Sequence, residues 1–135
     1  MTRLRVRFAE TDQMGVAHHG AYAAWLEVAR VEWLRERGHA YTELEASGVS
    51  LAVAELRVAY RAAARFDDLL QIATTLTYAG SRGCGFAYRV ERAADGILVA
   101  NAETRHVATG RSGRAVRLPP DWSVFLRSCV DAEAG

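Results

Sequence analysis

Alternating hydrophobic and polar positions run through much of the chain and predict β-strands. Leu4, Val6 and Phe8 alternate with arginines, which is the period of a strand with one buried face. Four later runs show the same alternation, at residues 55–61, 70–78, 84–90 and 97–109. Ala94-Asp95-Gly96 lies between the last two runs and is typical of a tight hairpin turn. The pattern therefore predicts five strands, four of them in a meander.

A period of three to four residues predicts one long helix at residues 22–37. Its apolar positions are Tyr22, Trp25, Leu26, Ala29 and Trp33, broadened by Val28, Val31 and Leu34. Because the helix is apolar on more than one side, we expect a curved sheet to wrap around it. Gly38 is expected to end the helix, residues 38–50 to form a loop that can move, and Asp121 to cap a last short helix.

The length of 135 residues suits one α+β domain that spans residues 1–135. The net charge of +1, with basic and acidic residues intermixed, gives no reason to expect a nucleic-acid partner. All 17 Lys+Arg residues are arginine, which excludes chemistry that needs a lysine amine. Cys84 and Cys129 are far apart and indicate neither a zinc site nor a redox pair. With no signal-peptide pattern and no membrane-spanning run, we expect a cytoplasmic protein.

The candidate chemistry lies just before the predicted helix. Asp12 precedes His18 and His19 across a turn that contains Gly15. Backbone N–H groups at a helix start lack intrahelical partners, and a carboxylate beside such donors suits attack on a carbonyl group. Two other interpretations stay open: Asp12 as an ordinary turn residue, and Asp12 with both histidines as metal ligands. Packing of His19 at the helix start and exposure of His18 are equally compatible with the sequence.

A resemblance to a known family adds to this interpretation. The chain contains aromatic-x-x-Thr-Asp-x-x-Gly-Val at residues 8–16, a histidine seven residues after the aspartate, a tyrosine three further on, and Trp-Leu-Glu-x-x-Arg at residues 25–30. Residues 60–68 and Leu118-Pro119 continue the match. In these features the chain resembles 4-hydroxybenzoyl-CoA thioesterase-like hotdog proteins, although Ala21 stands where relatives often have asparagine.

The resemblance implies a single hotdog domain, an antiparallel sheet of about five strands around one long helix. It implies hydrolysis of acyl-CoA thioesters at a subunit interface of a homodimer or a homotetramer of dimers, with no cofactor because coenzyme A is part of the substrate. Asp12 would be the general base or the nucleophile, and the backbone N–H of His19 would polarise the carbonyl group. An acyl-thioester hydratase or dehydratase and a non-enzymatic acyl-CoA-binding module remain alternatives.

Further residues are candidates for substrate binding. Gly15, Tyr22 and Tyr60 are expected near the acyl group, while Trp25 and Trp33 fit either a pocket or the core. For the coenzyme A phosphates we expect cationic and hydroxyl side chains at strand ends, although each arginine is equally compatible with a solvated surface position. These residues are Arg61, Arg65, Ser81 and Arg82. Asp67 and Asp68 are expected in a turn, with Asp68 accepting from backbone amides.

Overall fold

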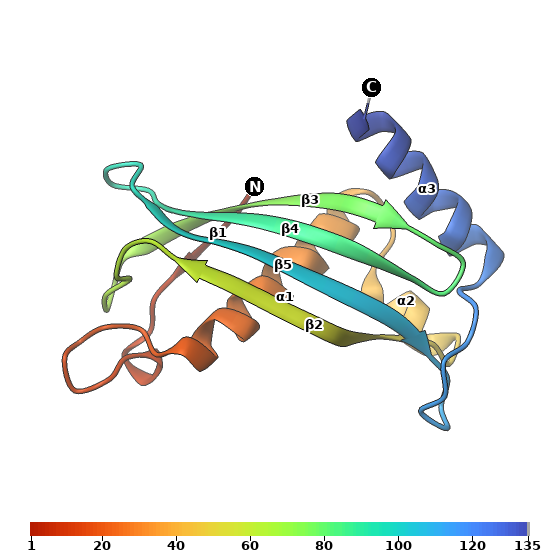
Figure 1. Cartoon of the computed structure of the whole chain (residues 1–135), viewed down its shortest axis with the longest axis horizontal. Coiled ribbons are helices and arrows are strands. Elements are labelled where there is room, and N and C mark those ends of the chain that lie inside the picture. Colours follow the sequence, from red (N-terminus) through yellow and green to blue (C-terminus); the bar gives the residue numbers. More distant parts are fainter. Residues whose placement is uncertain (135) are drawn as a thin grey trace.

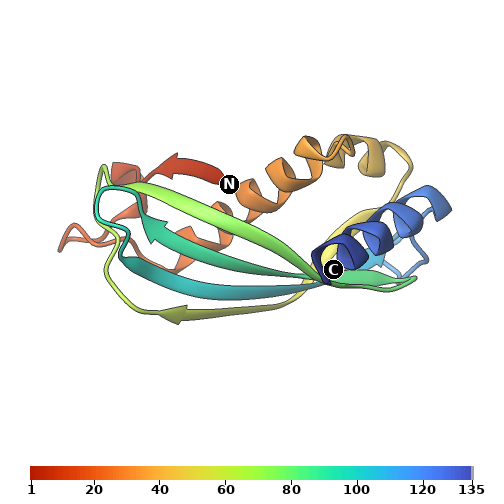
Figure 2. The ribbon, with the colours of Figure 1, turned by 90° about the horizontal axis from the view of Figure 1, so that it is seen from above.

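The structure, a computed structural model, describes residues 1–134 and the side chains of residues 1–132. Its elements are β1 (Thr2–Arg5), the 3-10 turn η1 (Phe8–Glu10), α1 (His19–Glu36), α2 (Tyr41–Ala46), β2 (Ser50–Tyr60), β3 (Leu69–Ala79), β4 (Gly83–Arg92), β5 (Leu98–Thr109) and α3 (Pro120–Ala134). The strands form one five-stranded antiparallel sheet in the order β1-β3-β4-β5-β2. The long helix α1 lies across one face of this sheet (Figures 1 and 2). The predicted α+β layout is confirmed, but the four later strands do not form one meander, because β2 pairs with β5 and not with β3.

The strands β3, β4 and β5 largely follow the predicted alternation, whereas β2 does not: Leu56 and Tyr60, which were expected to face the core, are 43% and 44% exposed. In β4, Phe86, Tyr88 and Val90 are buried beneath α1, whereas Arg89 between them is exposed. The strand β2 begins at Ser50, five residues before the predicted start. The early half of β2 was not predictable because its apolar residues alternate with alanines, which have a low preference for strands.

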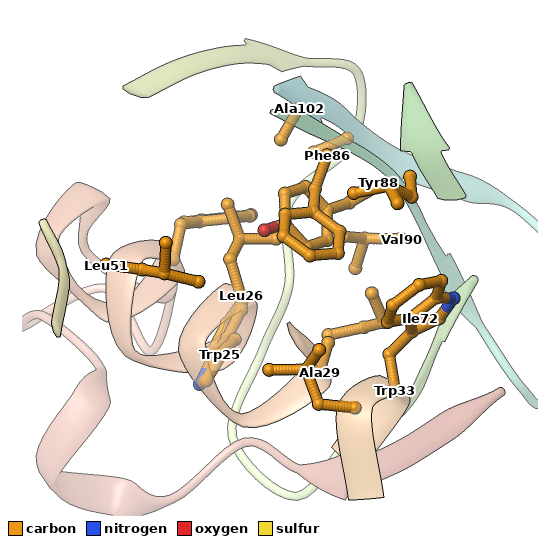
Figure 3. Packing of buried hydrophobic residues seen from close by; sticks show 14 of the residues in the cluster. Trp25, Leu26, Ala29, Trp33, Leu51, Ile72, Phe86, Tyr88, Val90 and Ala102 are labelled. Atoms are coloured by element: carbon orange, nitrogen blue, oxygen red, sulfur yellow. The ribbon is translucent and has the colours of Figure 1, made fainter. Parts of the chain in front are cut away.

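The helix α1 buries one side along its whole length. Its buried residues are Ala21, Tyr22, Trp25, Leu26, Ala29, Trp33 and Leu34. Leu26 and Leu34 are 0% exposed, and burying such a side chain contributes about 1.5–3 kcal/mol to stability. Figure 3 shows the Leu26 side chain pointing toward Phe86 and Val90 of the sheet. The core interpretation of Trp25 and Trp33 is confirmed.

Residues 38–50 are not the loop that we predicted, because they contain α2. Leu44 of this helix is fully buried, and the Tyr41 hydroxyl accepts a hydrogen bond from the Leu51 N–H at 2.9 Å. A helix of six residues is too short for a helical period to stand out in the sequence. Gly38 does end α1, with a left-handed φ of 81°.

The last helix is also longer than predicted, and Asp121 does not cap it. The helix α3 begins at Pro120, so Asp121 lies within its first turn. Proline suits the first position of a helix because no N–H is needed there. Trp122 and Leu126 are buried, and the Phe125 ring stacks on the His39 ring with the centroids 3.7 Å apart.

No helix in residues 1–134 is long and apolar enough to cross a membrane.

Phe8 does not face the core, contrary to the alternation that we traced from Leu4 to Phe8. The strand β1 ends at Arg5, and Phe8 lies in η1 with 76% of its surface exposed. Its ring packs edge-on against Phe66, with the ring centroids 5.6 Å apart. The alternation thus continues past the point where the chain turns.

We predict that Gly83→Ala destabilises the sheet. A Cβ atom at residue 83 would lie 2.1 Å from the carbonyl oxygen of His106 on β5, so the two strands would have to separate. Overpacking of this kind costs about 1–3 kcal/mol, which urea unfolding measures. Gly80→Ala is the matched control, because its Cβ atom would lie no closer than 3.8 Å to its neighbours. Equal stability of the two variants would contradict the prediction.

Candidate active site

The candidate aspartate lies in a compact loop between η1 and α1. Thr11 and Ala17 form an isolated antiparallel bridge, and the Asp12 N–H donates to the Val16 carbonyl at 2.8 Å. Oδ1 of Asp12 accepts hydrogen bonds from the N–H groups of Met14 at 2.8 Å and Val16 at 3.1 Å. The Asp12 side chain is exposed. The loop therefore fixes one oxygen of the carboxylate, while Oδ2 has no hydrogen-bond partner among the described residues.

The segment after β2 supports this loop from a second side. The Ala17 N–H donates to the Ala64 carbonyl at 2.8 Å, and Val16 forms a bridge with Arg65. Asp68 accepts from the Arg65 N–H at 2.9 Å, which confirms its predicted role in a turn. Asp67 completes this turn with a φ of 69°. Arg65 therefore lies beside the Asp12 loop.

The helix α1 begins three residues earlier than predicted because His18 caps it. Nδ1 of His18 accepts a hydrogen bond from the Ala21 N–H at 3.1 Å. Histidine is not a usual capping residue, so the sequence did not indicate this start. His19 and Gly20 are the first two helical residues, and N–H groups in a first turn have no intrahelical acceptor. These two donors are available to a bound group.

Beside this helix start is a groove of about 300 Å³. Its lining residues are Val16, Ala17, His19, Tyr22, Tyr60, Arg61, Ala62 and Ala63. The His19 ring stacks on Tyr60 with centroids 4.5 Å apart, and Tyr22 meets Tyr60 edge-on at 5.0 Å. Burial raises the pKa of Tyr22, and the neighbouring Tyr60 adds to this effect, so the Tyr22 hydroxyl stays protonated. The structure thus brings together four of the predicted site residues.

Ser81 and Arg82 are not brought to this groove within one chain. They lie in the β3–β4 turn, where the Arg82 carbonyl accepts from Ala108 and the Ser81 carbonyl from Leu118. In Figure 1 this turn lies near α3, at the end of the sheet opposite the Asp12 loop. Tyr60 pairs with Ala100, so the rise along β5 places Arg82 about 25 Å from the groove. The expected grouping of Ser81 and Arg82 with Arg61 and Arg65 is wrong for a single chain.

Comparison with known proteins places the chain in a family. Residues 6–126 match the thioesterase-like superfamily. The chain belongs to this superfamily. The acyl-CoA thioester hydrolase YbgC of Escherichia coli O157:H7 is 36% identical over 95 residues, which cover 70% of this chain and 71% of that protein.

Two solved structures agree with the fold. A DHNA-CoA thioesterase from Staphylococcus aureus is 28% identical, with a TM-score of 0.91 over 98% of this chain and 91% of that one. A hypothetical protein from Thermus thermophilus, TT1821, is 45% identical, with a TM-score of 0.88 over 95% and 97% of the two chains. The hotdog fold implied by the sequence resemblance is confirmed.

The thioesterase-like chain has a second groove on the helix side of the sheet, also of about 300 Å³. We call it the α1–α2–β2 groove, and it is lined by Glu27, Arg30, Val31, Leu34, Tyr41, Glu45, Leu51 and Val53. Arg30 donates a long, 3.4 Å hydrogen bond to the Tyr88 hydroxyl. From Tyr88 a buried polar chain continues to Thr104 at 2.7 Å and from Thr104 to His106 at 2.8 Å. This chain was not predicted from the sequence.

His106 is the buried end of that chain. It is 1% exposed, and among the described residues its Nδ1 has no hydrogen-bond partner. Burial lowers the pKa of His106 to about 4, and the positive charge of Arg30 contributes to the shift. The imidazole is therefore neutral in the folded protein at neutral pH.

We predict that His106 makes the protein less stable as the pH falls from about 6.5 toward 4. In this range the unfolded chain binds a proton at His106 that the folded chain does not bind. This difference lowers the free energy of unfolding by up to roughly 3 kcal/mol in total. Urea unfolding at several pH values measures the slope. His106→Gln removes the titrating group, so its free energy of unfolding should change less with pH than that of the wild type. Equal slopes would contradict the prediction.

Proposed function

We propose that the chain hydrolyses acyl-CoA thioesters, with Asp12 as the catalytic carboxylate and the first turn of α1 as the group that polarises the carbonyl. Membership of the thioesterase-like superfamily and the names of its relatives support the reaction. The residue assignment rests on the loop that joins the Asp12 carboxylate to the first turn of α1. This loop holds Oδ1 of Asp12 by two amides and leads directly into the exposed first turn of α1.

The reaction follows from these donors and this carboxylate. The thioester carbonyl oxygen would accept from the backbone N–H of His19, which stabilises the negative charge that develops there. As a general base, Asp12 would take a proton from water while the water oxygen adds to the carbonyl carbon. As a nucleophile, its own oxygen would add, and water would later hydrolyse the mixed anhydride. In both routes the C–S bond breaks and the coenzyme A thiolate leaves.

The remaining groove residues would bind and orient the substrate. The acyl group of the substrate would contact the His19 ring and the two tyrosines, Tyr22 and Tyr60. Gly15 would allow the turn of the loop, because glycine adopts its left-handed φ of 76° without strain. Arg61 and Arg65 would face the coenzyme A phosphates, since guanidinium groups bind phosphate through paired hydrogen bonds. No resident cofactor enters this reaction, because a thiolate is a good leaving group and coenzyme A belongs to the substrate.

We also propose that the enzyme is a homodimer, or a tetramer of such dimers, that pairs through β2. Within the described residues β2 is hydrogen-bonded to β5 on one side, so its other edge is open to a further strand. The open edge is 11 residues long and carries two charged side chains, Glu55 and Arg57. The opposite edge, β1, is four residues long and includes the exposed Arg3 and Arg5. Short, charged edges resist pairing, which favours β2 as the interface.

Antiparallel pairing of two β2 strands would combine residues from both chains in each active site. The Ser50 end of one β2 would lie beside the Tyr60 end of the other. The α1–α2–β2 groove, which includes Leu51 and Val53, would then adjoin the partner's His19 groove and extend it for the acyl group. The same pairing would bring Ser81 and Arg82 closer to the partner's site than to the site of their own chain.

We predict that Asp12→Asn abolishes most thiol release from a panel of acyl-CoA substrates. Loss of a positioned base typically lowers kcat by about 10²–10⁴. Asp121→Asn, at an exposed carboxylate on α3, is the control and should keep wild-type activity. An Asp12→Asn enzyme within about tenfold of the wild-type kcat would refute the assignment. Consumption of an enoyl-CoA without thiol release would point to hydration instead of hydrolysis.

We further predict that two inactive variants complement each other. Val31→Trp would fill the α1–α2–β2 groove from the helix side, and Asp12→Asn would remove the carboxylate. A mixed dimer would contain one intact site, because it combines Asp12 of one chain with the open groove of the other. Co-refolding equal amounts should restore about a quarter of wild-type activity if dimers form at random. Light scattering measures the mass in parallel; a monomer, or no recovery in a dimer, would contradict the shared site.

A further inference from the structure

Glu10, two residues before Asp12, has a buried carboxylate with a full set of partners. It is 6% exposed. Oε1 accepts from the Arg7 N–H at 2.7 Å, and Oε2 accepts from the Arg7 guanidinium at 3.2 Å and from the Trp25 indole N–H at 2.9 Å. Burying a carboxylate is costly unless it is paired and hydrogen-bonded. These three donors offset the cost of burying the Glu10 carboxylate.

These contacts connect the Asp12 loop to α1. Through its side chain Glu10 is bonded to Trp25, six residues into the helix from His19. Through its backbone carbonyl it accepts from the N–H of His18, the capping residue, at 2.9 Å. Glu10 is therefore bonded to the helix at two levels, and Asp12 lies two residues after it in the chain. The distance between the Asp12 carboxylate and the first turn of α1 depends on this connection.

The loop itself has hydrogen bonds that do not involve Glu10. The Asp12 N–H and the Gly15 N–H donate to Val16 and Asp12 within the loop. Loss of the Glu10 side-chain contacts would therefore leave the loop conformation intact but weaken its attachment to the helix, which would then depend on the bond from the His18 N–H to the Glu10 carbonyl. Small displacements of this kind matter in catalysis, because a misplacement of about 1 Å can cost a factor of about 10² in rate.

We propose that Glu10 is a positioning residue, which acts through its bond to Trp25 to hold the Asp12 carboxylate against the first turn of α1. This role rests on the function proposed above for Asp12. Because its side chain is buried, Glu10 would act through Trp25 and not by contact with the substrate. Desolvation alone would raise the pKa of Glu10, but the hydrogen bonds from the Arg7 backbone and side chain and from Trp25 together hold it below its usual range. The side chain is therefore ionised, as a charge-assisted bond to the indole requires.

The test uses Glu10→Gln and Trp25→Phe, which disrupt the same bond from opposite sides. We expect each variant to lower kcat at least tenfold while KM changes less than about threefold. The double variant should be no slower than the slower single variant, because both changes remove one shared interaction. Trp33→Phe is the matched control for Trp25→Phe: it is a buried indole on the same helix whose Nε1 has no hydrogen-bond partner among the described residues. Glu43→Gln, at an exposed carboxylate on α2, is the control for Glu10→Gln.

A readout independent of catalysis accompanies the kinetics. Amide hydrogen exchange at Ala17 and His18, whose N–H groups donate to Ala64 and Glu10 outside the loop, should accelerate in both variants and stay unchanged in both controls, while the thermal midpoint shows that each protein is folded at the assay temperature. If Asp12→Asn is inactive and Glu10→Gln keeps kcat within twofold of the wild type, the proposal is overturned. If Asp12→Asn stays active, the proposed function fails, and hydrogen exchange alone decides the positioning role: unchanged exchange overturns it and faster exchange supports it.

Discussion

One constraint governs this molecule: α1 must be buried along its length while its first turn stays open. Ala21 and Tyr22 are already buried, yet His19 and Gly20 directly before them are exposed. The transition from core to solvent therefore occurs within the first helical turn. The His18 cap lies at this transition, and the Glu10–Trp25 bond lies about one turn further along the helix. The position of the site is consequently set by the same packing that holds the fold together.

Periodicity predicts the long elements and fails where an element is short or its residues are small. The strands β3, β4 and β5 each span at least 10 residues, so their alternation stands out from chance. The helix α2 has six residues, fewer than two turns, and shows no comparable pattern. Phe8 illustrates the reverse error, because polar and apolar residues continue to alternate after the chain has left the sheet.

The candidate site was predictable in part because its motif is contiguous in sequence. Asp12, His19 and Tyr22 lie within 11 consecutive residues, so local structure alone brings them near one another. Arg82 lies at the opposite end of the sheet. Alternation along a strand does not show which ends of neighbouring antiparallel strands lie at the same end of the sheet. The burial of His106 could have been predicted from the sequence, because alternation places it on the same side of β5 as the buried residues Ala100, Ala102 and Thr104. Its hydrogen-bonded chain to Tyr88 depends on the strand register, which only the folded structure supplies.

The two edge strands of the sheet, β1 and β2, differ in length, and this difference affects how many chains can associate through sheet edges. A strand edge that accepts a partner normally offers the partner's far edge to a third chain, and repeated addition of this kind builds fibrils. Here the far edge is β1, with four residues and two exposed arginines, so a chain joined through β2 presents a poor template for the next. Growth through sheet edges would then stop at two chains. If two chains pair through β2, the exposed arginines of β1 would hinder the addition of a third chain and so reduce aggregation through sheet edges.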